Sequence, residues 1–76
     1  MLEIEYTNGT KIRVRTLRSA FKCLRMAYPE AIACDTAGWD VGPDDKMPSE
    51  VVFVWATEEA ANTLGTDPVA SISRVK

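Results

Sequence analysis

The segment EIEYTNGTKIRVR, residues 3–15, constrains the fold more than any other part of the chain. Asn8-Gly9 between two alternating segments is a strong signal for a β-hairpin. A two-residue turn there would put the two apolar stripes on opposite faces of the ribbon, because strand side chains alternate between faces. A three-residue loop at 7–9, with Gly9 in the left-handed conformation, puts both stripes on one face.

The free energy of burying apolar side chains decides between these two registers. Burial of aliphatic pairs contributes several kcal/mol, which exceeds the backbone preference for a two-residue turn. Each exposed charge pair on the other face adds about 0.2–1 kcal/mol. We therefore predict the three-residue loop, with these pairs: Leu2 with Val14, Ile4 with Ile12, Glu3 with Arg13, and Glu5 with Lys11.

A helix is predicted next, starting after the N-cap Thr16 and ending near Tyr28, because Pro29 follows. Its apolar residues recur at the spacing of a buried helical stripe. That stripe contains Leu17, Ala20, Phe21, Leu24, Ala27 and Tyr28. The basic residues Arg18, Lys22 and Arg25 share another flank of the same helix.

The remaining chain divides at its Gly and Pro residues. The segments between these residues are predicted to form a short strand over 31–35, a loop over 36–49, a strand over 50–56, a helix over 58–64 and a strand over 69–75. The run EVVFVWA predicts a central strand covered on both faces, with Trp55 in the core. Thr57 and the acids after it are typical of a helix start, and Gly65 of a helix end.

The last strand is half polar because of Ser71, Ser73 and Arg74, which predicts a position at the sheet edge. The predicted order is therefore β-β-α-β-β-α-β. We expect one small α+β domain over residues 1–76, with a largely antiparallel sheet and helices packed on it.

The amino-acid composition limits which catalytic and metal sites the chain can form. The chain has no histidine, so the commonest general base is missing and a Ser or Cys triad cannot be built within it. Cys23 and Cys34 are too few for a disulfide scaffold and are expected to be reduced. We expect no metal, no cofactor and no enzymatic activity. The longest apolar run, residues 51–56, is far shorter than a membrane span, so we expect a soluble, cytoplasmic protein without membrane contact.

Charge is divided unevenly along the chain. Residues 1–34 carry six basic and three acidic residues, a net of +3, whereas residues 35–76 carry three basic and eight acidic residues, a net of −5. The two halves sum to the overall charge of −2. The basic residues suggest an alternative function, contact with nucleic-acid phosphates. They are Arg13, Arg15, Arg18, Lys22 and Arg25. An isoelectric point near 5.0 argues against this alternative.

The loop at 36–49 (TAGWDVGPDDKMPS) is long for so small a domain and is the first candidate binding surface. It holds Trp39, a residue type enriched among interface hot spots, together with Asp40, Asp44 and Asp45. Two alternatives are that Trp39 folds back over the core, or that 38–41 extends the preceding strand. The spacing of the acids does not match a calcium loop. The basic flank Arg18, Lys22 and Arg25 is the second candidate surface.

In size and character the chain resembles the small accessory proteins of phages and other mobile elements, among them the anti-CRISPR proteins. The resemblance rests on a short, acidic chain without histidine or catalytic signatures, and it transfers no individual residue. It implies an inhibitor that occludes a larger host protein or nucleoprotein complex.

The sequence therefore predicts a non-catalytic protein-binding module. Its partner-binding residues are expected to be Trp39, Asp40, Asp44, Asp45, Arg18, Lys22 and Arg25. Nucleic-acid binding through the basic surface is the alternative. A homodimer formed by an edge strand is a third hypothesis.

Overall fold

The N-terminal hairpin adopts the three-residue loop, so the predicted register is confirmed. The computed structural model describes residues 1–75. Strand β1 (Leu2–Tyr6) pairs with β2 (Lys11–Val14) in antiparallel fashion, with Ile4 opposite Ile12 and Glu5 opposite Lys11. The loop closes through hydrogen bonds from Tyr6 N to Thr10 O and from Gly9 N to Tyr6 O, both 2.9 Å. Gly9 has a φ of +92°, as the left-handed position requires.

Helix α1 (Leu17–Ala27) begins as predicted. The Thr16 hydroxyl accepts a hydrogen bond from Ser19 N at 3.1 Å, which satisfies a free backbone donor of the first turn. The buried stripe is confirmed for its first four members: Leu17, Ala20, Phe21 and Leu24. It was predicted too long, because Ala27 is exposed and Tyr28 is only half-buried. The helix ends at Ala27, and Tyr28 leaves the helical conformation but still packs against the core from the position after the helix.

A second hairpin occupies the first part of the predicted loop. Strand β3 (Ile32–Cys34) pairs with the two-residue strand β4 (Asp40–Val41). Its loop closes through hydrogen bonds from Asp35 N to Trp39 O (2.9 Å) and from Gly38 N to Asp35 O (3.0 Å). Gly38 has a φ of +88°, so this is the same three-residue geometry as in the first hairpin. The prediction of one unstructured loop over 36–49 was wrong here, and the order gains a strand.

The complete order is β-β-α-β-β-β-α-β, in a small α+β domain with an antiparallel sheet. The later elements are β5 (Val51–Trp55), α2 (Glu58–Asn62) and β6 (Ala70–Arg74). Helix α2 is shorter than predicted but has the predicted N-cap, since the Thr57 hydroxyl accepts from Ala60 N at 3.0 Å. None of the described helices is long and apolar enough to cross a membrane.

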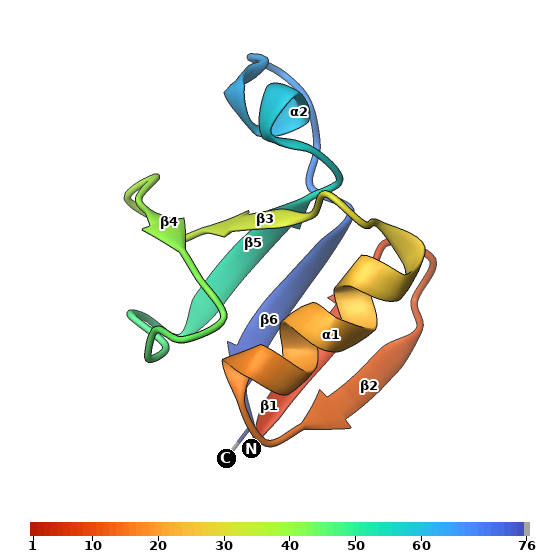
Figure 1. Cartoon of the computed structure of the whole chain (residues 1–76), viewed down its shortest axis with the longest axis vertical. Coiled ribbons are helices and arrows are strands. Elements are labelled where there is room, and N and C mark those ends of the chain that lie inside the picture. Colours follow the sequence, from red (N-terminus) through yellow and green to blue (C-terminus); the bar gives the residue numbers. More distant parts are fainter. Residues whose placement is uncertain (76) are drawn as a thin grey trace.

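The six strands lie in the order β2-β1-β6-β5-β3-β4 (Figure 1). Strand β6 therefore lies in the interior of the sheet, between β1 and β5, and the edge position predicted for it was wrong. The polar residues of β6 are explained by the open face of the sheet rather than by an edge position. Ala70 and Ile72 face the core, whereas Ser71 and Ser73 face solvent on the opposite side of the sheet.

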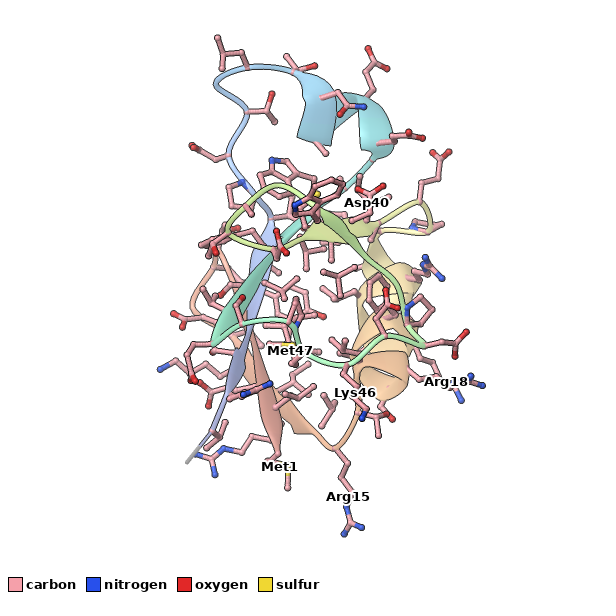
Figure 2. The ribbon with its side chains drawn as sticks, turned by 90° about the vertical axis from the view of Figure 1, so that its left-hand side faces the viewer. Met1, Arg15, Arg18, Asp40, Lys46 and Met47 are labelled. Carbon is pink, nitrogen blue, oxygen red and sulfur yellow. The ribbon has the colours of Figure 1, made fainter. Side chains whose placement is uncertain are left out.

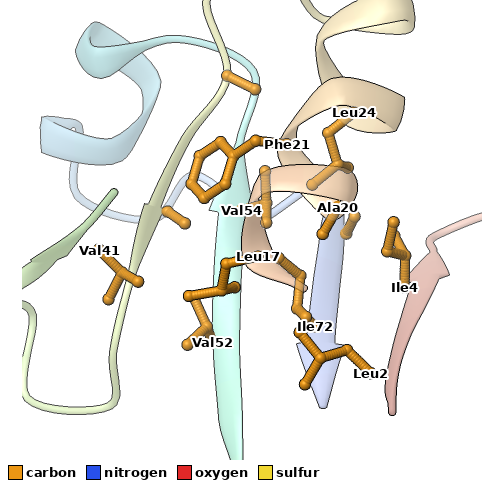
Figure 3. Packing of buried hydrophobic residues seen from close by; sticks show 13 residues of the cluster. Leu2, Ile4, Leu17, Ala20, Phe21, Leu24, Val41, Val52, Val54 and Ile72 are labelled. Carbon is orange, nitrogen blue, oxygen red and sulfur yellow. The ribbon is translucent and has the colours of Figure 1, made fainter. Parts of the chain in front are cut away.

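Helix α1 covers one face of the sheet, which we call the inner face (Figure 1). The side chains of Phe21, Leu24 and Leu17 project from α1 toward strand residues such as Val54 and Ile72 (Figure 3). The six largest fully buried side chains all lie between α1 and the inner face of the sheet. They are Phe21, Ile4, Leu24, Ile72, Val52 and Val54.

The opposite face, which we call the outer face, has no comparable cover. Helix α2 packs mainly against β5 and does not bury Phe53 and Trp55, which stay half-buried. Strand β5 is an interior strand, but the prediction that both its faces are covered, with Trp55 in the core, was wrong. Ile12 was also misplaced, because it is 37% exposed on the edge strand β2 rather than in the core.

The two hairpin glycines give a stability prediction. Gly9→Ala and Gly38→Ala each force a Cβ into the left-handed region and are expected to lower the free energy of unfolding by about 1–2 kcal/mol. Gly42→Ala is the matched control, because Gly42 is not at positive φ and a Cβ there meets only Asp45 Oδ2 at 3.4 Å. Urea denaturation measures all three. Equal losses for the three variants would contradict the assigned loop geometry.

Candidate protein-binding surface

Large apolar side chains gather on the outer face over β3 and β5. Register places Cys34 opposite Phe53 and Ile32 opposite Trp55. The rings of Phe53 and Trp55 meet edge to face, with centroids 6.5 Å apart and planes at 64°. The Trp55 indole Nε1 donates to Thr66 O at 3.0 Å, which fixes the ring. We call this half-buried group the outer patch, and it consists of Ile32, Cys34, Val51, Phe53 and Trp55.

A pocket of about 390 Å³, which we call the outer pocket, opens between the outer patch, the β3–β4 hairpin and α2. Apolar walls come from Phe53 and Trp55, whereas the ionisable side chains are Asp35, Asp40 and Glu58 together with the Cys34 thiol. Its full lining is Ile32, Cys34, Asp35, Thr36, Gly38, Asp40, Phe53, Trp55, Glu58, Ala61 and Asn62. None of these residues is Lys or Arg, so the pocket is aromatic and acidic.

The hairpin loop holds two of the three acids in place. Asp35 Oδ1 accepts hydrogen bonds from Ala37 N and Trp39 N, both at 2.9 Å, so its carboxylate shapes the loop. Asp40 pairs with Cys34 across the hairpin, and the Cys34 thiol donates to Asp40 Oδ1 at 3.6 Å. Glu58 comes from the first turn of α2. Two separate segments, the β3–β4 hairpin and α2, therefore bring negative charge to one hollow.

The Cys34 thiol is unsuited to nucleophilic chemistry at neutral pH. Burial raises its pKa above the ordinary value, and the hydrogen bond to Asp40 and the charges of Asp40 and Asp35 raise it further. Because the thiolate is the reactive form, we expect Cys34 to react slowly. Both cysteines are free thiols.

Trp39 lies in the loop of the β3–β4 hairpin and is 74% exposed, so the alternative in which it folds back over the core was wrong. Its neighbours Gly38 and Asp40 line the outer pocket. Trp39 flanks the pocket, and Asp40 lines it.

The two other acids of the predicted loop serve internal contacts. Asp44 forms an ion pair with Arg18 of α1, between side chains that are 73% and 77% exposed. Asp45 Oδ2 accepts from Gly42 N at 2.7 Å and closes the turn after β4. The loop and the basic flank, predicted as separate surfaces, therefore touch one another. A hollow of about 310 Å³ between them is lined by Arg18, Phe21, Lys22, Arg25, Pro43 and Asp44.

Several basic residues of the nucleic-acid alternative have partners within the chain. Arg13 Nε lies 3.6 Å from Glu3 Oε1, and Arg18 pairs with Asp44. The Arg25 guanidinium lies over the Phe21 ring, 5.0 Å from its centroid. These contacts reduce the charge and the surface available to phosphates, so no observation favours this alternative over protein binding.

Folding brings together basic residues from both halves of the chain. Lys46 and Arg74 come from the acidic half of the chain, yet they join Arg15 around a second pocket of about 370 Å³, in which these three basic residues outnumber the one acid, Asp45. Figure 2 shows Arg15 and Lys46 with Met1 toward one end of the molecule and Asp40 toward the end that carries α2. Arg74 donates to Met47 O at 2.7 Å, which fixes its position there. The outer pocket and this basic pocket therefore lie at opposite ends.

Sequence reasoning missed the outer patch, because it placed β5 between two covered faces. Two signals could have revealed the site. The triplet Thr36-Ala37-Gly38 repeats the pattern of Thr7-Asn8-Gly9 and marks a second hairpin of the same kind. The serines of β6 mark a face that stays in solvent across the middle of the sheet.

The described residues contain no group of three or more Cys, Asp and Glu side chains arranged to hold a metal ion. No family model matches the chain, and comparisons with the curated proteins and with the solved structures find no match.

The thiol environment gives a prediction that uses alkylation as its readout. In a Cys23→Ala background, Asp40→Asn removes a negative charge beside Cys34 and should lower the pKa of the thiol. The rate of reaction with iodoacetamide at pH 8 should then rise, and its pH profile should move to lower pH. Burial persists, so the profile should stay above that of a free cysteine. An unchanged profile would show that Asp40 does not act on Cys34.

Proposed function

We propose that this chain is a non-catalytic protein-binding module that binds a larger protein through its outer patch. The observation that carries the proposal is the group of Phe53, Trp55 and their neighbours, which stays half-buried although α2 packs against β5. Solvated sheet faces of antiparallel sheets are ordinarily polar, as the β1–β2 half of this one is. An apolar half with aromatic side chains is typical of an interface.

The available side chains support binding rather than turnover. The chain has no histidine, and the thiol in the outer pocket has a raised pKa. Aromatic residues are the commonest anchors of interfaces, and Phe53, Trp55 and the exposed Trp39 lie on or beside the same pocket.

In its specific form, the module is an inhibitor of host defence of the anti-CRISPR kind, acting in the cytoplasm by occluding a protein or nucleoprotein complex. The resemblance in size and character supports this form. The opposite charges of the two ends support it too, because they give electrostatic complementarity to a partner with both basic and acidic surfaces.

The proposal predicts the result of a capture experiment. Immobilised chain should retain a partner from a lysate of the host cell, and Phe53→Thr should reduce the captured amount by about tenfold or more. Threonine keeps strand propensity while removing the aromatic ring. Trp39→Ala tests separately whether the flanking indole takes part.

Met26→Ala is the matched control, because Met26 is 84% exposed on α1 and far from the outer face. Thermal melts and amide spectra establish that each variant is folded. If Phe53→Thr folds and still captures the same partner in the same amount as Met26→Ala, the outer patch is not the binding surface.

A further inference from the structure

We propose that the outer pocket receives a basic side chain, Arg or Lys, from a protein partner, whose neighbouring apolar residues lie on the outer patch. This inference rests on the proposed function and names the chemistry of the partner. It is argued from the walls of the pocket, from their charge and from the surface beside it.

Charge complementarity selects the occupant. Asp35, Asp40 and Glu58 come from the hairpin and from α2 and converge on one hollow without a basic residue in its lining. An anionic side chain would meet three like charges there, whereas an ammonium or guanidinium group gains three favourable interactions. Burial raises the pKa of the Cys34 thiol most, and Asp40 and Asp35 raise it further, so two of these carboxylates already disfavour a negative charge beside them.

The aromatic walls select against a bare metal ion or a small inorganic cation. Phe53 and Trp55 offer ring surface to the alkyl stem and to the charged head of a long basic side chain. The Trp55 ring is held by its hydrogen bond to Thr66 O, so the wall is already in place. A volume of about 390 Å³ holds a side chain with its solvent, at the small end of the roughly 300–1,000 Å³ usual for ligand sites.

The surface next to the pocket accepts the residues that flank such a side chain. Phe53 also lines a more open hollow of about 280 Å³, whose other lining residues are Tyr6, Pro68 and Ala70 together with the polar Glu5, Thr7 and Ser71. Phe53 therefore borders both hollows. A segment that crosses the outer face places a basic side chain in one hollow and an apolar side chain in the other.

The test uses two peptides that differ only in charge, Ac-Val-Arg-Val-NH2 and Ac-Val-Cit-Val-NH2, in which citrulline is the neutral counterpart of arginine. Each is titrated into isotope-labelled chain while the indole N–H signal of Trp55 is followed by NMR. Trp39→Ala assigns the two indole signals. The arginine peptide should bind about fivefold more tightly than the citrulline peptide at low salt.

Variants of the acidic residues test whether the preference for the arginine peptide arises in the outer pocket. Asp40→Asn and Glu58→Gln together should remove the preference for arginine, while the citrulline peptide binds as before. Glu59→Gln is the matched control, because Glu59 lies in the same first turn of α2 but does not line the pocket. Asp35 is left intact because it shapes the hairpin loop.

Each outcome decides the proposal. A preference for arginine that survives the double variant, equal binding of the two peptides, or no shift of the Trp55 signal would overturn it. A Trp55 signal that shifts on dilution of the chain alone would identify a second copy as the occupant and overturn it as well. Capture of a partner through Phe53 together with equal peptide binding would leave the proposed function standing and reject only the basic side chain.

Discussion

A single three-turn helix has to shield a sheet of six strands, and this mismatch governs the rest of the structure. Helix α1 can cover only one face, so the chain concentrates its core there, with Phe21 and Leu24 above Val54 and Ile72. A domain of this length buries a modest share of its surface. A second covering layer on the outer face would need more residues than the chain contains. The outer face is left exposed to solvent, and its side chains are polar in one half and apolar in the other.

Over β1, β2 and β6 the outer face is polar, with Glu3 near Arg13 and the serines of β6 between strands. Over β5 and β3 it is apolar and aromatic. Folding stability does not require this second half to be apolar, because the core is complete on the other face. The difference between the halves is the basis of the proposed function, in which the apolar half contacts a protein partner.

Local signals predicted the elements of the fold well, and long-range relations poorly. The register of the first hairpin followed from matching two apolar stripes, and the start of α1 followed from Thr16 and its capping bond. The position of β6 could not be obtained this way, because a half-polar strand fits both an edge and an interior position above an open face. The same ambiguity hid the outer patch. Lys46 and Arg74 also escaped notice, since only the sheet brings them to Arg15.

The β3–β4 hairpin has a property that matters beyond the binding surface itself. Its shape is specified internally by the Asp35 carboxylate and by Gly38, whose bonds involve no residue outside the loop. The positions between them, Thr36 and Ala37, are exposed and carry no core contact. Such a tip can diverge under selection, or accept grafted recognition sequences, while the scaffold beneath it keeps its thermodynamic stability.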